Sequence, residues 1–205
     1  MWCKMFISGR VNPVIFKNMF KVRISGEEYQ ECVKCSKGDN FWGNSKKGTY
    51  GQGLCRTEED PFRPARIGKL GEMGFSKLFG LPFDNEYRQK GDRYDFTMRG
   101  YSIDIKTSKW RKEGPGLIMR YNEQGVEIPL SKDIYVFSYC NYEVLKKELA
   151  EVVYVGYCLK DDIQNYPVKL GYRGGKHKNI EVDFKSLIPI AHLYEWCGFN
   201  TSNNF

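Results

Sequence analysis

The sequence predicts an α/β domain from about residue 61 onward, preceded by a short cysteine-containing segment. A stretch with helical periodicity is followed by several short strand patterns, and a hydrophobic content of 41% allows a buried core. With 15% aromatic residues, the composition excludes a disordered chain or a fibrous repeat. The length of 205 residues suits one domain with a small addition. We therefore expect an N-terminal appendage over residues 1–60 and a main domain over residues 61–205.

The first helix is predicted over residues 64–79. Pro64 suits a first helical position, and Gly80 and Pro82 end the pattern. Its apolar residues recur at helical spacing: Ile67, Leu70, Met73, Phe75, Leu78 and Phe79. Three glycines interrupt it, Gly68, Gly71 and Gly74, and each disfavours a helix by up to about 1 kcal/mol relative to Ala. Their presence predicts close approach of a sheet or of a ligand.

Short strands are predicted after this helix. Residues 94–98 and 101–107 form a hairpin signal around the turn dipeptide Arg99-Gly100. Further elements are expected as follows: strands over 117–121, 134–139, 152–158 and 180–184, a short helix over 142–148, a basic turn over 171–178, and a closing helix over 186–196 interrupted by Pro189.

The hairpin carries two acidic residues in opposed positions. If Arg99-Gly100 is a two-residue turn, Phe96 pairs with Ile103 and Asp95 lies opposite Asp104. Directly opposed side chains have Cβ atoms about 4.5–5.5 Å apart, where like charges are destabilising. Alternation then places Asp104 and Lys106 on one face, with Ile103 and Ile105 on the other.

Two opposed carboxylates beside a lysine predict a bound cation. Oxygen ligands of this kind suit Mg²⁺ or Mn²⁺. The alternative is an exposed hairpin in which the acids pair with Lys106 and Arg93. Glu72, in the middle of the predicted helix, is a third acid that could reach the same ion. It could equally lie on a solvated face, paired with Ser76 or Lys69.

This order of residues resembles the PD-(D/E)XK nuclease superfamily, the fold of many restriction enzymes, resolvases and repair nucleases. An acid on an early helix is followed by Asp95 and by Asp104-Ile105-Lys106 across a hairpin. The resemblance covers about residues 64–110. No proline precedes Asp95, and Asp92 is a rival for its role.

The resemblance implies a restriction-endonuclease-like mixed β-sheet flanked by helices. It also implies that Glu72, Asp95 and Asp104 bind Mg²⁺, that the carbonyl of Ile105 assists, and that Lys106 is the catalytic lysine. The implied reaction is hydrolysis of DNA phosphodiester bonds to give 5′-phosphate products. The alternatives are a catalytically inactive nuclease-like module that binds DNA or a protein, and an RNA-directed nuclease.

The net charge of +7, from 32 Lys and Arg against 25 Asp and Glu, is compatible with a polyanionic partner. Six basic residues are candidates for contacting nucleic acid: Arg66, Lys109, Arg111, Arg173, Lys176 and Lys178. Each could also be an ordinary solvated charge. Relatives that cut both strands often dimerise, so a homodimer is also considered.

The cysteines suggest a second metal site. Cys32 and Cys35 have the spacing of a zinc knuckle, and Cys55 and Cys3 could complete a site for zinc or an iron–sulfur cluster. The alternative is reduced structural thiols. We expect the other three, Cys140, Cys158 and Cys197, to be core residues.

The sequence predicts an intracellular, cytoplasmic protein without a membrane partner. Lys4 and Arg10 interrupt the apolar run at the start of the sequence, so this segment does not resemble a secretory signal. No apolar stretch approaches the roughly 18 residues that a membrane-spanning helix requires.

Overall fold

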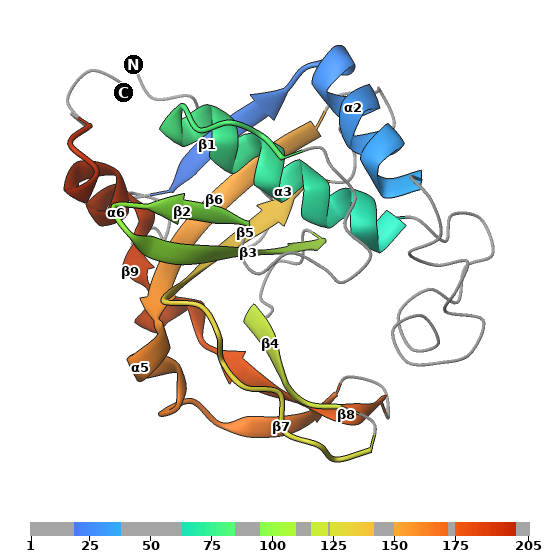
Figure 1. Ribbon diagram of the computed structural model, residues 1–205, viewed down its shortest axis with the longest axis vertical. Helices are drawn as coiled ribbons and strands as arrows, with labels where there is room; N and C mark the ends of the chain where they lie inside the picture. The colour runs from blue at the N-terminus through green and yellow to red at the C-terminus, as the bar shows by residue number, and fades with distance from the viewer. Residues whose placement is uncertain are drawn as a thin grey trace, which may run out of the picture.

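A curled, six-stranded mixed β-sheet forms the centre of the fold (Figure 1). The structure is a computed structural model and describes residues 19–37, 63–84, 95–109, 116–122, 124–141, 150–171 and 175–199. Five strands lie in the following order: β1 (Phe20–Ile24), β6 (Ala150–Leu159), β5 (Ile134–Cys140), β3 (Tyr101–Lys109) and β2 (Phe96–Met98). The sixth, β9 (Ile188–Pro189), pairs with β6. Only the β3–β5 pair is parallel among these strands.

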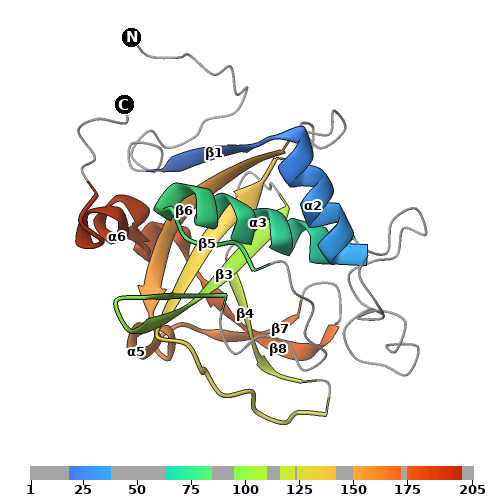
Figure 2. The same ribbon diagram turned by 45° about the horizontal axis from the view of Figure 1, so that its top comes forward.

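Helices cover one face of this sheet. Helix α3 (Arg63–Phe79) crosses β6, β5 and β3, while α2 (Gly26–Lys37) packs beside it (Figure 2). Helix α6 (Ile190–Trp196) contributes to the same core. Leu70 and Phe75 of α3 are fully buried there, together with Ile103 and Tyr154 of the sheet.

A smaller antiparallel sheet covers part of the opposite face. It contains β4 (Gly116–Tyr121), β8 (Gly175–Val182) and β7 (Val168–Gly171) in that order. Its residues Ile118 and Ile180 pack against Phe137 of β5 in a second core. Because both faces of β5 are covered, every residue of that strand is buried, as is typical of a central strand. Helix α5 (Lys160–Ile163) follows β6, and a short 3-10 helix (Phe184–Ser186) follows β8.

The predicted helix over 64–79 is confirmed as α3, and its glycines allow close packing. A Cβ atom on Gly71 would lie 1.7 Å from Oγ1 of Thr107, and one on Gly74 would lie 2.6 Å from the hydroxyl of Tyr154. Tyr154 also donates a hydrogen bond of 2.5 Å to the carbonyl oxygen of Gly71. The expected approach of a sheet is thus confirmed at these two glycines. At Gly68, by contrast, no atom lies within 4 Å of an added Cβ.

The predicted hairpin is confirmed, with the expected register over residues 96–98. Strand β2 begins at Phe96, so the expected pairing of Asp95 with Asp104 is not part of the ladder, and the backbone N–H of Asp95 donates to the carbonyl oxygen of Ile103 at 3.0 Å. Phe96 pairs with Ile103, Thr97 with Ser102 and Met98 with Tyr101. Arg99 and Gly100 have φ angles of 49° and 84°, which is the conformation of a type I′ turn. The twist of this turn matches that of the strands, so it fixes which residues face each other.

Three predicted elements need correction, and a fourth lies outside the described residues. The basic segment 171–178 is not all turn, since residues 175–178 belong to β8 and pair with β7 or β4. The closing helix begins at Ile190 rather than at residue 186, because residues 188–189 pair with β6. The strand expected over 180–184 ends at Val182. The short helix expected over 142–148 lies outside the described residues.

The strands expected over 117–121, 134–139 and 152–158 are confirmed as β4, β5 and β6. Within the segment that we expect to be an appendage, residues 1–60, β1 pairs with β6 and α2 packs on α3. These parts of the segment therefore join the main sheet and its helical layer. No helix among the described residues is both long enough and apolar enough to span a bilayer.

Candidate functional site

The β2–β3 hairpin brings two carboxylates and one lysine together. Asp95 immediately precedes β2, and its Oδ2 accepts a hydrogen bond of 2.6 Å from the backbone N–H of Ile105. On β3, Nζ of Lys106 lies 2.6 Å from Oδ2 of Asp104. Ile103 and Ile105 are buried against the helical layer, so alternation directs Asp104 and Lys106 to the opposite face. These three side chains, Asp95, Asp104 and Lys106, are called the hairpin cluster below.

Burial makes the hairpin cluster electrostatically unusual. Burial, followed by the neighbouring charge of Asp104, raises the pKa of Asp95 to about 6. Burial alone would lower the pKa of Lys106, but the Asp104 carboxylate outweighs it, so the pKa of Lys106 lies above its ordinary value. Two carboxylates therefore share one ammonium group, and their mutual repulsion is only partly relieved.

One oxygen of Asp104 is a candidate metal ligand. Its Oδ2 atom is buried and lies 2.6 Å from Nζ of Lys106, so the lysine already supplies the cation and the donor that a buried carboxylate oxygen needs. A metal ion bound to this oxygen would have to compete with Lys106 for it. The two carboxylates could serve as ligands of a hard divalent cation, since Mg²⁺ is commonly held by one or two carboxylates and several waters, whereas the ammonium group of Lys106 cannot be a ligand.

Tyr135 completes the surroundings of the cluster, and our sequence analysis did not identify it. It lies on β5 directly beside Asp104 in the parallel pairing, and it is buried. Burial raises its pKa, and the charge of Asp104 adds to this effect. Tyr135 lies beside Asp104 because β3 pairs with β5, and no local sequence pattern indicates that these two strands pair.

Glu72, the third predicted acid, is engaged elsewhere. Its Oε2 lies 2.5 Å from Nζ of Lys69, and only 17% of its side chain is exposed. This is the Lys69 pairing that the sequence leaves open. Within the described ranges, no three side chains of His, Cys, Asp or Glu lie close enough together to hold a metal ion jointly. The structure thus brings Asp95 and Asp104 together and holds Glu72 in a separate ion pair.

The basic candidates are distributed over several elements. Lys109 is exposed at the end of β3, and Lys178 is exposed on β8 with its Nζ 5.6 Å from the centre of the Tyr121 ring. Arg66 is partly buried on α3. The other candidates, Arg111, Arg173 and the side chain of Lys176, lie outside the described residues, as does the rival acid Asp92.

Two of the four N-terminal cysteines can be placed. Cys32 is fully buried on α2, and its Sγ donates to the carbonyl oxygen of Lys69 at 3.5 Å. Burial raises the pKa of Cys32 and of Cys35. Cys32 therefore helps to pack α2 against α3, while Cys3 and Cys55 lie outside the described residues. The predicted core positions of Cys140 and Cys158 are confirmed, since both are buried.

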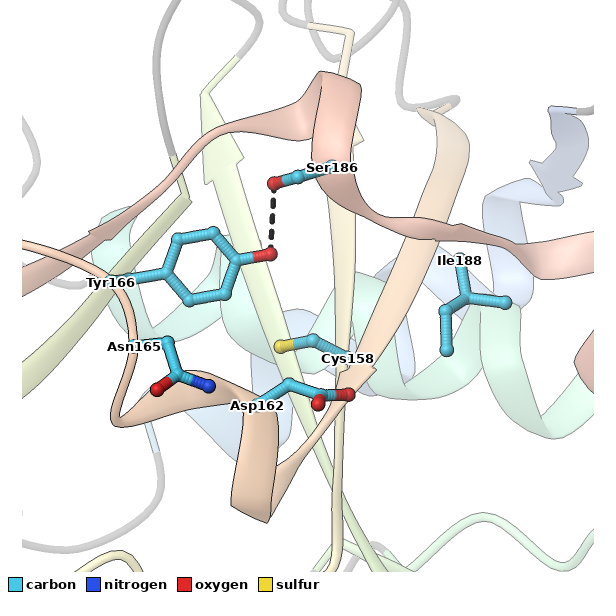
Figure 3. Close-up of a pocket in the computed structure, with 6 residues that line it drawn as sticks. All are labelled: Cys158, Asp162, Asn165, Tyr166, Ser186 and Ile188. Carbon is cyan, nitrogen blue, oxygen red and sulfur yellow. Dashed lines mark hydrogen bonds between the residues drawn. The ribbon is translucent and has the colours of Figure 1, made fainter.

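A separate pocket of about 260 Å³ lies at the opposite side of the main sheet from α3 (Figure 3). Its walls come from β6, α5 and the segments around the 3-10 helix, and they consist of Cys158, Asp162, Asn165, Tyr166, Ser186 and Ile188. The hydroxyl groups of Tyr166 and Ser186 are 2.8 Å apart and hydrogen bonded to each other. No member of the hairpin cluster lines this pocket.

No protein-family model, curated protein or solved structure matches this chain.

Proposed function

We propose that the protein is a metal-dependent deoxyribonuclease of the PD-(D/E)XK type. The observation that carries this proposal is the hairpin cluster, in which Asp104 contacts Lys106 and Asp95 is near enough for the charge of Asp104 to raise its pKa. The mixed sheet with a helical layer is compatible with the restriction-endonuclease-like fold, which is part of the proposal.

The proposed cation is Mg²⁺ or Mn²⁺, held by Asp95 and Asp104. In an extended strand the N–H and C=O of one residue point to the same edge, so we expect the carbonyl of Ile105 to face Asp95, as its N–H does. Two carboxylates and one carbonyl leave positions for water and for a phosphate oxygen. When bound, the cation lowers the pKa of its water and polarises the scissile phosphate.

Lys106 has a defined part in this reaction. Without a metal ion, the charges of Asp104 and Asp95 keep the pKa of Lys106 above its ordinary value, so its side chain is an ammonium group at neutral pH. In the proposed reaction this group would stabilise negative charge on the phosphoryl oxygens or hold the attacking water. Asp95 and Asp104 provide the charge that retains the cation.

The proposed substrate is DNA, with Lys109 and Lys178 as the exposed described residues that could neutralise its phosphates. RNA is the alternative substrate, since phosphodiester chemistry does not itself distinguish the two sugars. A homodimer would allow both strands of a duplex to be cut. A zinc or iron–sulfur site at Cys32, Cys35, Cys55 and Cys3 is a further part of the proposal. Cys32 would have to give up its hydrogen bond to the carbonyl oxygen of Lys69 to bind the metal, and elemental analysis of the purified protein tests this site.

A second candidate function is a nuclease-like module that binds DNA, or a partner protein, without cutting. The observation that favours it is the pairing of Glu72 with Lys69, which leaves only two of the three implied ligands together. The two functions make opposite predictions for cleavage.

The decisive experiment is a cleavage assay with Mg²⁺ or Mn²⁺ on plasmid, linear duplex, single-stranded and branched DNA, and on RNA. We expect Asp104→Ala and Lys106→Ala each to lower the cleavage rate about a hundredfold or more, because each removes a charge acting at the reacting phosphate. Glu151→Gln is a matched control. Glu151 is a half-buried acid paired with Lys21 on the same sheet, away from the hairpin cluster, and its loss should leave the rate unchanged.

Equal digestion by Asp104→Ala and the parent protein would remove the assignment of the hairpin cluster. Binding of DNA without cleavage by the parent protein would favour the second candidate function.

A further inference from the structure

The pocket beside α5 carries one negative charge. Among the residues that line it, only Asp162 is charged at neutral pH, because burial and then the charge of Asp162 raise the pKa of the Cys158 thiol to about 12. Within the described residues, the Asp162 carboxylate forms no ion pair. Lys160 and Lys185 are close to the lining residues in the chain, but neither lines the pocket. No described side chain therefore neutralises this carboxylate.

The two hydroxyl groups of the pocket can offer a ligand only acceptor oxygens. Ser186 has one hydroxyl hydrogen and donates it to the carbonyl oxygen of Asp183 at 2.6 Å. In the 2.8 Å bond between Ser186 and Tyr166, the Tyr166 hydroxyl is therefore the donor. Both hydrogens are used within the protein, so lone pairs on the two oxygens remain for a ligand.

Acceptor groups lie on more than one side of the pocket. Asp162 and Asn165 lie on one side and Ser186 on the other (Figure 3). The side-chain amide of Asn165 adds a carbonyl oxygen to this set. Ile188 and the ring of Tyr166 supply apolar surface, and Tyr166 packs against the second core. A ligand that suits this lining is a cation with several hydrogen-bond donors and a small apolar part.

A guanidinium group meets these requirements better than an ammonium group or a metal ion. It is planar and permanently charged, and it has five N–H donors where an ammonium group has three. Two of these donors can pair with the Asp162 carboxylate, which leaves three for the amide and hydroxyl oxygens. A metal ion would find only one carboxylate, no imidazole and a thiol that stays neutral.

The size of the pocket limits the ligand to a small molecule or a single side chain. Its volume of about 260 Å³ is below the roughly 300–1,000 Å³ of pockets that hold drug-sized ligands. A guanidinium head group with a short apolar stem is of suitable size.

We propose that this pocket binds an organic cation with a guanidinium head group, and that Asp162 is the counter-ion of that group. The ligand is a small free guanidine or the arginine side chain of a peptide, since both carry this head group on an apolar stem. The proposal goes beyond the proposed nuclease function and does not depend on it, because no residue of the hairpin cluster takes part.

The test is calorimetric titration of the full-length protein with butylguanidine. We expect the parent to bind it with a Kd below about 1 mM. Asp162→Asn should weaken binding about tenfold, because the charge-assisted pair is lost. Asp161→Asn is the matched control, since it removes the same charge from the same helix at a residue that does not line the pocket. It should change the affinity less than about twofold.

Circular dichroism checks the fold of each variant. Tyr166→Phe removes one acceptor oxygen and should weaken binding about threefold, and it replaces Asp162→Asn if the latter does not fold. Butylurea, which has the same stem and a neutral head group, should not bind detectably.

A capped arginine, N-acetylarginine methylamide, distinguishes the two sources of the head group. Binding at least as tight as that of butylguanidine would indicate the arginine side chain of a peptide. Weaker binding would indicate a free guanidine. Both results require that butylguanidine binds at Asp162, so both support the site.

Absence of butylguanidine binding to the parent would overturn the proposal. Equal weakening by Asp161→Asn and Asp162→Asn would also overturn it, because it would show only a general attraction to acidic surface. Equal binding of butylurea and butylguanidine would overturn the role of charge. None of these outcomes bears on metal-dependent cleavage, which the variants of the hairpin cluster test separately.

Discussion

On the face of β3 that meets α3, Ile103 and Ile105 are buried and Thr107 touches Gly71. On the opposite face of the same strand, Asp104 and Lys106 lie beside Asp95. The first face gains stability from apolar burial and close contact. On the second face, burial and then the neighbouring charge of Asp104 raise the pKa of Asp95, so an ionised Asp95 costs stability there.

The difference suggests which changes should affect stability and which should affect activity. Substitutions on the α3 side should lower the free energy of unfolding and leave the chemistry of the hairpin cluster intact. Substitutions in the cluster should abolish the proposed cleavage and, at Asp95, increase stability. Such a trade-off is common where a site retains groups that its fold does not favour.

Gly71→Ala tests the α3 side with the largest expected effect. The new Cβ would lie 1.7 Å from Oγ1 of Thr107, so the helix has to move away from the sheet. We expect the free energy of unfolding to fall by about 2–3 kcal/mol, measured by urea denaturation. Gly68→Ala is the matched control, because no atom lies within 4 Å of its Cβ. It should stabilise the protein by about 0.5–1 kcal/mol through helix propensity. Similar effects at both glycines would contradict the close packing.

Asp95→Asn tests the opposite face through pH. The native pKa of about 6 exceeds the ordinary value of 3.8, so between these pH values the folded protein holds a proton that the unfolded chain has lost. The stability due to Asp95 therefore falls as pH rises through this window and stays low above it. With a metal chelator in the buffer, we expect Asp95→Asn and the parent to have the same free energy of unfolding near pH 4. At pH 8 the free energy of unfolding of Asp95→Asn should be about 1–2 kcal/mol higher.

Asp133→Asn should show the opposite trend in the same urea titrations. Hydrogen bonds from Ser102 hold the pKa of Asp133 below its ordinary value, so this variant should lose stability relative to the parent as pH rises. If Asp95→Asn were less stable than the parent at pH 8, the ionised Asp95 carboxylate would not be destabilising the folded protein.

Tyr154→Phe has the smallest expected effect and returns to the α3 side. The change removes one buried hydrogen bond to the carbonyl oxygen of Gly71. We expect a loss of about 1 kcal/mol in the free energy of unfolding, because the carbonyl keeps its place in the helix. Tyr166→Phe, which removes an exposed hydroxyl contact with Ser186, should change stability much less. Cleavage by both variants should match that of the parent.

The local parts of this fold could be predicted from the sequence. The Arg99-Gly100 turn fixes the hairpin register over residues 96–98, and this register predicts that Asp95 and Asp104 lie close together. The apolar spacing of α3 and its glycines likewise predict a helix that packs closely on a sheet. In each case the interacting residues are near one another in the chain, so propensity and periodicity are sufficient.

The long-range parts could not be predicted. β1 pairs with β6, about 130 residues later, and no local pattern links the two. The basic segment around Lys178 resembles a turn because of its glycines, yet pairing with Leu170 and Tyr121 makes it a strand. The choice between Glu72 as a ligand and Glu72 as the partner of Lys69 also depends on how α3 is placed over β3. Helical spacing alone allows both.

The type I′ turn at Arg99-Gly100 also has a consequence for changes in chain length. Side chains alternate between the faces of a strand with a period of two, so a slip of one residue exchanges the faces. One residue inserted between Asp95 and Asp104 would be accommodated by a longer turn, or it would shift the register of the hairpin. In the second case the charged side chains of β3 would point into the apolar layer under α3. We therefore expect the hairpin to tolerate replacement of Arg99 and Gly100 by residues that adopt a positive φ. We expect it to tolerate few insertions or deletions between Asp95 and Asp104.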